Sequence, residues 1–289
     1  MRKIFNFTTF IVILLSSLFC PEIIMGKTLT IAAWDFCPSH CYDKNKKSLI
    51  KEAPGFVIEI YQAIFKDVQI VNLPFNRGMQ ETDVGRFDAV SLPLKFSKAE
   101  LKDKIRQLPR MGPIYTRLIY TEKAVAPYNA SCFFVNSDSN WKYKGIDSIK
   151  GNRLGTTMDY EYGKKLNAFF EKVRSRGDKV TLQELTGSNI PERNLLKLKS
   201  NRVDLVMGDK NGYQYVIKQM EKNKIIPKGS LKLSSCVPNS KTLLYIGFTS
   251  RRPKESKRNS HLFDLGIERL RKSGKLQEIL LKYDIQDWE

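Results

Sequence analysis

Short runs rich in β-branched residues alternate along this chain with longer segments whose apolar residues recur at helical spacing. Thr28–Ala33 (TLTIAA) is a run of the first kind, and Phe56–Phe65 (FVIEIYQAIF) is a segment of the second. The first pattern predicts buried strands, and the second predicts amphipathic helices. Strands that alternate with helices in this way favour an α/β fold in which helices pack on a sheet.

The alternation occurs twice. In the first half we expect strands or helices at Thr28–Ala33, Phe56–Phe65, Gln69–Leu73, Met79–Gly85, Phe87–Leu92 and Ser97–Leu108, with a turn at Pro74–Gly78. In the second half we expect them at Arg153–Gly155, Tyr160–Arg174, Lys179–Leu182, Arg193–Ser200, Val203–Met207 and Tyr213–Met220. GRFDAVSL at Gly85–Leu92 and NRVDLVMGD at Asn201–Asp209 both place Arg-x-Asp before a buried strand, which favours two lobes of similar design.

The last part of the chain is expected to return to the first lobe. Leu243–Phe248 (LLYIGF) reads as a buried strand, and Arg251–Arg258 reads as an exposed basic loop. Leu262–Tyr283 follows as a long helix interrupted at Gly274. Its apolar residues, Leu265 and Leu270 among them, predict packing against the first lobe.

The chain begins with features of an export signal. Arg2 and Lys3 precede an apolar run at Ile4–Phe19, and cleavage is expected after Gly26. Cys20 raises the alternative of a lipoprotein, although the residue before it is large. No later run is long and apolar enough to span a bilayer. We therefore expect residues 1–26 to be a signal peptide and the mature protein to be periplasmic.

The chain is strongly basic, with 49 Lys and Arg against 30 Asp and Glu and a formal charge of +19. Residues 1–26 carry two basic residues and one acidic residue, so the exported chain would carry +18. The lysines are scattered, with no basic cluster interleaved with aromatic residues, and we therefore expect no nucleic-acid partner. A solvated basic surface on a monomer is the favoured interpretation, and weak attraction to anionic lipid headgroups stays open.

Four cysteines remain after the expected cleavage: Cys37, Cys41, Cys132 and Cys236. An even number in an exported chain favours disulfides. Cys37 and Cys41 are close enough to close a local loop, which leaves Cys132 and Cys236 to pair over a long distance. A metal site with His40 as a third ligand is the alternative for the first pair, but no fourth ligand is visible. We expect neither a metal nor another cofactor.

Two short segments carry the candidate binding chemistry. Gly155-Thr156-Thr157 reads as a small-residue turn that begins a helix, and free backbone N–H groups at such a turn favour an anion. A threonine N-cap that only starts the helix is the alternative. Trp34 and Asp35 directly follow the first strand, and ligands of open α/β sheets lie beyond the carboxyl ends of strands.

The order and spacing of several motifs resemble the family 3 extracellular solute-binding proteins, the polar amino-acid-binding branch of the type II periplasmic binding proteins. The motifs are GFVIEI (55–60), GRFDAV (85–90), MGPIY (111–115), IKGNRLGTT (149–157), RVDLVMGD (202–209), LYIGFTSRRP (244–253) and the closing RLRKSGKLQEILLKYDI. The resemblance implies two Rossmann-like lobes joined by two crossing hinge strands, near Cys132–Val135 and Leu243–Phe248. Lobe 1 would then comprise residues 27–133 and 244–289, and lobe 2 residues 134–243. Cys132 and Cys236 would both lie near the hinge.

The resemblance also implies part of a binding site between the lobes. The turn at Gly155, Thr156 and Thr157 would hold a ligand carboxylate, and Asp209 would take a ligand ammonium. A helix N-cap is the alternative role of Asp209.

The family's first-lobe Thr-x-x-Arg motif is absent, because Ser97 to Glu100 (SKAE) stands in its place. Arg77 and Lys95, both expected at turns, are the candidate replacements for the missing cation. The ligand itself is not fixed by the sequence beyond a small polar solute with amine or carboxylate character.

Three functions follow from these observations. The leading one is a non-enzymatic binding protein that captures a small polar solute for an ABC permease or a membrane receptor. The second is a dehydratase-like enzyme of the same fold that acts on a small organic acid, with Glu100 as its acid or base. The third is an interaction module whose cleft has decayed.

Overall fold

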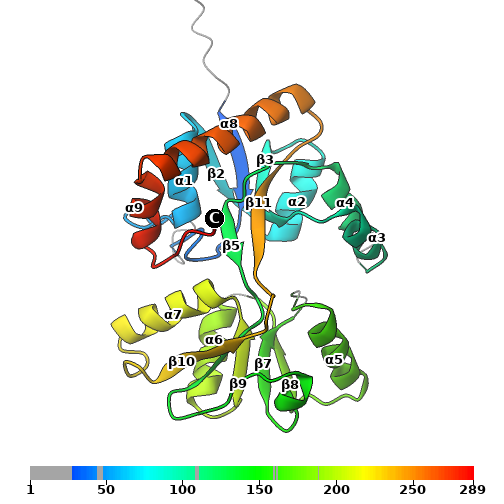
Figure 1. Ribbon diagram of the computed structural model, residues 1–289, viewed down its shortest axis with the longest axis vertical. Coiled ribbons are helices and arrows are strands. Elements are labelled where there is room, and N and C mark those ends of the chain that lie inside the picture. The colour runs from blue at the N-terminus through cyan, green and yellow to red at the C-terminus, as the bar shows by residue number, and fades with distance from the viewer. Residues whose placement is uncertain (1–27, 44–47, 108–110, 159, 161, 188) are drawn as a thin grey trace, which may run out of the picture.

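The computed structural model describes residues 28–43, 48–107, 111–158, 160, 162–187 and 189–289. Within them the chain forms two separate sheets, each flanked by helices (Figure 1). The expected signal peptide, its cleavage after Gly26 and the lipoprotein alternative at Cys20 lie outside the described residues. In the described part, no helix has both the length and the apolar character needed to cross a membrane.

The first sheet, with its helices, is here named lobe 1. Its strands run in the order β2-β1-β3-β11-β4, and β5 pairs with β11. The first three strands along the chain are parallel, whereas β11 is antiparallel to β3. The strands are β1 (Leu29–Ala33), β2 (Val68–Asn72), β3 (Ala89–Leu94), β4 (Ile119–Tyr120), β5 (Ala126–Tyr128) and β11 (Thr242–Phe248). The helices are α1 (Phe56–Ile64), α2 (Phe75–Asp83), α3 (Lys98–Gln107), α4 (Gly112–Arg117), α8 (Pro253–Lys272) and α9 (Lys275–Leu281).

The second sheet, with its helices, is named lobe 2, and its strand order is β10-β6-β9-β7-β8. Strand β7 is parallel to both of its neighbours, and β6 is antiparallel to β9 and β10. The strands are β6 (Cys132–Asn136), β7 (Leu154–Thr157), β8 (Leu182–Leu185), β9 (Leu205–Gly208) and β10 (Leu231–Cys236). The helices are α5 (Lys164–Ser175), α6 (Ile190–Lys199) and α7 (Lys210–Lys222), with a 3-10 turn at Ile146–Ile149.

Each lobe has its own hydrophobic core. In lobe 1, Ile31 of β1, Phe56 of α1 and Phe263 of α8 belong to one cluster. Residues from the beginning and from the end of the chain therefore share this core. In lobe 2, Phe133 and Phe134 of β6 point to opposite faces of the sheet and enter two different clusters. This alternation follows from the period of two along a strand. The predicted α/β class with two lobes is confirmed.

The chain crosses between the lobes twice, from β5 to β6 and from β10 back to β11 (Figure 1). A disulfide between Cys132 and Cys236 joins the lobe 2 ends of the two crossings, where these residues are direct partners in the β6–β10 ladder. A second disulfide joins Cys37 and Cys41 in lobe 1. Both predicted pairings are therefore confirmed, and the metal alternative fails because a disulfide leaves neither cysteine a thiolate ligand.

The aspartate of each Arg-x-Asp motif has the same structural role in its lobe. Asp88 accepts hydrogen bonds from the backbone N–H and the hydroxyl of Thr30 in β1, at 2.9 and 2.7 Å. Asp204 accepts from the backbone N–H of Arg153, just before β7, at 2.8 Å. In each lobe the aspartate thus aligns the start of one central strand with its parallel neighbour, as the repeated motif suggested.

The strand expected at Lys179–Leu182 lies instead at Leu182–Leu185, and three further local predictions are wrong. The turn expected at Pro74–Gly78 is the first half of α2, where Gly78 allows close packing because a Cβ there would lie 3.1 Å from the Cβ of Ala32. The basic loop expected at Arg251–Arg258 is mostly the start of α8, which Pro253 begins at a position where its missing N–H costs nothing. The third is the helix expected from Thr156 and Thr157, which begins only at Lys164.

Candidate ligand-binding site

In both lobes the central parallel strands end in segments that carry the candidate residues. Strand β1 leads into Trp34 and Asp35, β7 ends at Thr157, and β9 ends just before Asp209. The two lobes also touch beside these segments. A Cβ built on Gly212, in the first turn of α7, would lie 3.6 Å from the carbonyl oxygen of Cys37. We take this region as the candidate site because ligands of open α/β sheets bind beyond the strands' carboxyl ends.

Asp209 is the most constrained charged group in this region. Only 5% of it is exposed, and it caps the N-terminus of α7. Its Oδ2 accepts from the backbone N–H of Gly212 at 2.8 Å, and its Oδ1 accepts from that of Asn129 at 3.0 Å. Burial raises the pKa of the carboxyl group to about 6, against the opposing effect of these hydrogen bonds. The backbone N–H of Asn211 also acts on the carboxyl group, so three backbone groups share its roughly four acceptor positions and one position is left for a ligand donor.

Asp209 also connects the site to the hinge. Asn129 lies in the first crossing between the lobes, and its carbonyl oxygen accepts from the N–H of Lys210 at 3.0 Å. The crossing segment therefore both donates a hydrogen bond to the start of α7 and accepts one from it. The alternative role of Asp209 as an N-cap is confirmed, and it leaves one acceptor position of the carboxylate for a ligand.

The segment Gly155–Thr157 is a strand and not the start of a helix. The chain continues beyond it to Gly163, which has a positive φ of 92° and precedes α5. Instead of facing a ligand, the N–H of Thr157 donates to the hydroxyl of Tyr162 at 2.9 Å, and this hydroxyl donates to the carbonyl of Thr157 at 3.3 Å. Tyr162 therefore occupies the backbone groups that the predicted carboxylate site requires.

The other two residues of this segment are enclosed. A Cβ on Gly155 would lie 3.0 Å from Oδ1 of Asn194, so the glycine makes room for that amide. Asn194 in turn donates to the carbonyl of Thr156 at 3.1 Å. The side chain of Thr156 is fully buried, and its hydroxyl has no hydrogen-bond partner among the described residues. The binding roles expected of Gly155, Thr156 and Thr157 stay predictions.

Tyr160 belongs to the same loop and is a residue that the motif spacing did not indicate. It is 40% exposed, and its ring centroid lies 6.3 Å from that of Tyr162. Desolvation of its hydroxyl, followed by the charge of Asp209, raises the pKa of Tyr160 to about 12. An aromatic ring with an open surface thus lies within the electrostatic reach of the buried carboxylate.

On lobe 1, Trp34 and Asp35 stand at the end of β1. Trp34 is partly buried, and its ring packs edge-on against Phe75 of α2 at 4.6 Å between centroids. Asp35 is exposed and accepts from the N–H of Tyr42 at 3.4 Å. Burial, and after it the charge of Asp35, raises the pKa of Tyr215 in α7. Asp35 therefore acts electrostatically on the other lobe.

The two candidate cations of lobe 1 are engaged locally. Arg77 lies in α2, with 66% of its side chain exposed, and its Nε is 3.8 Å from Oε1 of Glu81 one turn later. Lys95 donates to the carbonyl of Thr121 at 3.2 Å, and its Nζ is 3.5 Å from Oε2 of Glu122. Their expected ligand roles stay predictions, and the turn expected around Arg77 is a helix.

Glu100, the residue on which the enzymatic alternative depends, lies in the first turn of α3. Its Oε2 accepts from the N–H of Ser97 at 2.8 Å, and its own N–H donates to the hydroxyl of Ser97 at 3.3 Å. This reciprocal arrangement is a capping box. The position thus has a structural role, and the geometry offers nothing that favours the dehydratase alternative.

A buried histidine–serine contact was not visible in the sequence. Nε2 of His40 lies 2.8 Å from the hydroxyl oxygen of Ser91, which lies 2.6 Å from the hydroxyl oxygen of Tyr61. All three side chains are fully buried. They fasten the Cys37–Cys41 loop to the core of lobe 1, and no solute can reach them in this conformation.

A cavity of about 550 Å³ lies elsewhere, along the edge strand β8. Arg174 and Glu184 line it, and they satisfy each other with two hydrogen bonds of 2.7 Å. It lies on the flank of lobe 2, and neither Asp209 nor a lobe 1 residue is part of its lining. We therefore place the candidate site at the strand ends.

No protein-family model matches the sequence, and no curated protein matches it. Solved structures match its fold. The probable amino-acid ABC transporter extracellular-binding protein ytmK from Bacillus subtilis aligns at 17% identity and a TM-score of 0.61, over 89% of this chain and 97% of its own. A histidine kinase sensor domain with similarity to periplasmic binding proteins gives 16% and 0.59, over 89% and 96%.

The L-cystine solute receptor of Neisseria gonorrhoeae, in an unliganded open conformation, gives 19% identity and a TM-score of 0.55, over 89% of this chain and 92% of its own. At these identities the likeness concerns the fold. The architecture is that of the type II periplasmic binding proteins, as the motif resemblance implied.

Proposed function

We propose that this chain is an exported solute-binding protein that captures a small polar solute between its lobes. Structures of the same fold include binding proteins of amino-acid ABC transporters and a histidine kinase sensor domain. The captured solute would accordingly pass to an ABC importer or be reported to a membrane sensor. Two crossings between the lobes support closure by hinge motion, since a ligand that contacts both lobes selects the closed form.

The observation that carries the proposal is the position of Asp209. A carboxylate that is 95% buried at the junction of β9, α7 and the first crossing is costly to keep charged, and the backbone N–H groups that donate to it offset only part of this cost. A cationic solute would supply the charge partner that the described structure does not provide. Closure over that solute would strengthen the ion pair by removing water.

We further infer that the solute binds through an amine and not through a carboxylate grip. The N–H of Thr157 is taken by Tyr162, and Lys95 is held by Thr121 and Glu122. The acceptor Asp209 and the exposed ring of Tyr160 remain. A carboxylate near an aromatic face is a suitable environment for an ammonium group.

A thermal-shift screen of residues 27–289 tests the proposal. Amino acids, amino-acid amides, polyamines and small organic acids are each added in excess. A ligand at about a hundred times its dissociation constant stabilises the folded state by about 2.7 kcal/mol, which corresponds to a Tm increase of about 5–10 °C for a chain of this size. Amine-bearing compounds should produce the shift, and their carboxylate-free analogues should do so equally. No shift with any class would contradict the binding function.

The Asp209→Asn variant tests the site. Asparagine keeps the shape and one oxygen that can accept the capping bond from Gly212, but it replaces the other oxygen with an NH2 donor and removes the charge. Asp178→Asn is the matched control, because Asp178 is an exposed aspartate that also accepts backbone N–H groups on the flank of lobe 2. Calorimetry with a confirmed amine ligand should show at least a tenfold loss for the first variant and none for the control. Equal affinity in both variants would remove Asp209 from the site.

A further inference from the structure

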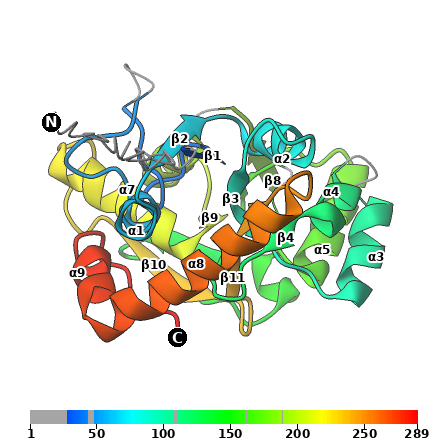
Figure 2. The ribbon, with the colours of Figure 1, turned by 90° about the horizontal axis from the view of Figure 1, so that it is seen from above.

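Helix α8 lies across the end of lobe 1 that faces away from lobe 2 (Figures 1 and 2). At about 100° per residue, one of its faces collects residues separated by multiples of three and four positions. We call this set the outer face of α8, and all of its members are exposed: Lys254, Arg258, His261, Leu262, Leu265, Arg269 and Lys272. Cations occupy both ends of the face, and two leucines lie between them.

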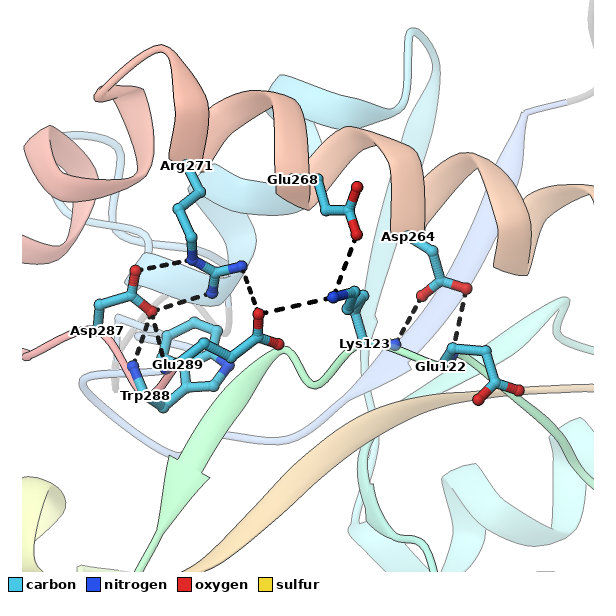
Figure 3. A network of polar contacts seen from close by, with 8 residues as sticks. All are labelled: Glu122, Lys123, Asp264, Glu268, Arg271, Asp287, Trp288 and Glu289. Atoms are coloured by element: carbon cyan, nitrogen blue, oxygen red, sulfur yellow. Dashed lines mark hydrogen bonds and ion pairs between the residues drawn. The ribbon is translucent and has the colours of Figure 1, made fainter.

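Glu255 and Glu268 border the outer face, Asp264 lies away from it, and each of these acidic residues has a partner. Asp264 accepts backbone N–H bonds from Glu122 and Lys123 at 3.1 and 2.8 Å, and Glu268 is 3.1 Å from Nζ of Lys123 (Figure 3). Glu255 is 3.7 Å from Nε of Arg252. Glu255 and Glu268 are thus paired with cations, Asp264 is bound by backbone N–H groups, and the cations of the outer face are exposed.

The underside of α8 is also held firmly in place. Arg271 binds both carboxylate oxygens of Asp287 at 2.8 and 3.0 Å and reaches Glu289 at 2.9 Å (Figure 3). Gly266 allows the helix to lie close to α1, since a Cβ there would meet Ile64 at 2.6 Å. The outer face is thus presented by a helix whose backbone is held in place.

The two leucines are unusual for such a position. Leu262 and Leu265 are 44% and 47% exposed, although the apolar periodicity predicts that Leu265 packs inward. Leu270, in contrast, packs partly buried against the lobe 1 core. Leucines flanked by lysine and arginine on one helix face are typical of helices that lie in the interface of an anionic bilayer.

We propose that the outer face of α8 docks lobe 1 on a bilayer surface that contains anionic phospholipid headgroups. The face is the convex side of one helix, and a flat surface of diffuse negative charge is its complement. The charge of +18 on the exported chain adds long-range attraction to such a surface. An acidic protein partner is less favoured, because two leucines provide too little apolar area for the core of a specific interface. The proposal does not depend on which solute the protein binds.

Vesicle co-sedimentation of residues 27–289 tests the docking. Vesicles of phosphatidylglycerol and phosphatidylcholine in equal parts are compared with vesicles of phosphatidylcholine alone, at low and at physiological salt. Each interfacial cation contributes about fivefold in affinity. Replacing four cations of the outer face by glutamine should therefore weaken binding to the anionic vesicles by about several hundredfold. The test variant is Lys254→Gln/Arg258→Gln/Arg269→Gln/Lys272→Gln.

The matched control removes the same charge from exposed positions of lobe 2. It is Lys172→Gln/Arg176→Gln/Lys199→Gln/Arg202→Gln. The control should bind within about threefold of the wild type, since its cations do not face the bilayer in the proposed orientation. Leu262→Ser/Leu265→Ser should weaken binding roughly tenfold, because two side chains no longer enter the apolar boundary. Circular dichroism verifies that each variant is folded.

Three outcomes would overturn the proposal. Equal weakening in both charge variants would mean that net charge alone attracts the chain. Absence of binding to anionic vesicles by the wild type would exclude a bilayer. Binding of polyglutamate that depends on the outer face, without vesicle binding, would assign the face to an acidic protein instead.

Discussion

Mild acid is expected to destabilise this protein through one buried side chain, the imidazole of His40. Its Nδ1 lies 3.2 Å from the carbonyl oxygen of Trp34, which can only accept, so Nδ1 carries the proton. Its Nε2 then accepts from the hydroxyl of Ser91. Both nitrogens are satisfied in the neutral ring, and burial of the whole side chain lowers its pKa from 6.5 to about 3.

The sign and size of the effect follow from this shift. Between pH 6.5 and pH 3 the unfolded chain protonates this histidine and the folded chain does not. The stability that neutral His40 confers is therefore complete above pH 6.5 and is lost as the pH falls toward 3. Each pH unit in this window costs about 1.4 kcal/mol. Acidification from pH 6.5 to 4.5 should thus remove about 3 kcal/mol of unfolding free energy.

The comparison of wild type with His40→Gln isolates this contribution. Urea unfolding followed by tryptophan fluorescence is suitable, because the ring centroid of Trp34 is 5.7 Å from that of His40. The stability advantage of the wild type should shrink by about 3 kcal/mol from pH 6.5 to 4.5. His261, the only other histidine, is exposed, so His261→Gln is the control and should change nothing. An advantage of the wild type over His40→Gln that is the same at both pH values would refute the reasoning.

Three other predictions concern the hinge and the site. Tyr162→Phe should lower the unfolding free energy by about 1–3 kcal/mol, because it leaves the buried N–H of Thr157 unpaired; urea curves identical to wild type would contradict this contact. Replacing Cys132 and Cys236 by serine opens a loop with a sequence separation of 104 and should cost about 4–5 kcal/mol, measured as a lower Tm than that of the wild type in non-reducing buffer, where the Cys37–Cys41 disulfide stays intact in both. The affinity of the protein for an amine ligand should fall as the pH drops through about 6, where Asp209 becomes protonated. Calorimetry that shows the same affinity at pH 7.5 and pH 5 would count against an ion pair between the ligand and Asp209.

The fold could be predicted because its strands and helices are locally consistent. Leu29–Ala33 and Thr242–Phe248 are strands close to the expected bounds, since β-branched and apolar runs leave few alternatives. The start of α5 could not be predicted. The ring of Tyr162 folds back onto Thr157, and Gly163 adopts a positive φ before the helix begins. Neither the contact of Tyr162 with Thr157 nor the positive φ of Gly163 produces a periodic pattern in the sequence.

The candidate site was predictable in its positions but not in its contacts. Asp209 stands out because it follows a buried strand and precedes a helix, and this local pattern gives the N-cap. Its second partner, Asn129, is 80 residues away. His40 and Ser91 are likewise 51 residues apart. Contacts at such separations depend on the order of the strands in the sheet. Local patterns in a single sequence do not reveal that order.

A net charge of +19 and a cationic solute are compatible because they act over different distances. Surface cations more than about 8 Å from the site are largely screened at physiological salt. The lobe 1 cations Arg77 and Lys95 already face Glu81 and Glu122. A solute ammonium about 4 Å from Asp209 gains about 4 kcal/mol at an effective dielectric constant of 20, which exceeds the residual repulsion.

The two proposals also support each other physically. An anionic leaflet has a surface potential of about −30 mV, which raises the local concentration of a monovalent cation about threefold. A binding protein docked there through α8 would meet its amine solute where that solute is enriched. The cations of the outer face bind the headgroups, whereas Asp209 lies in lobe 2, on the other side of the hinge. Docking and capture therefore use different charges, and neither neutralises the other.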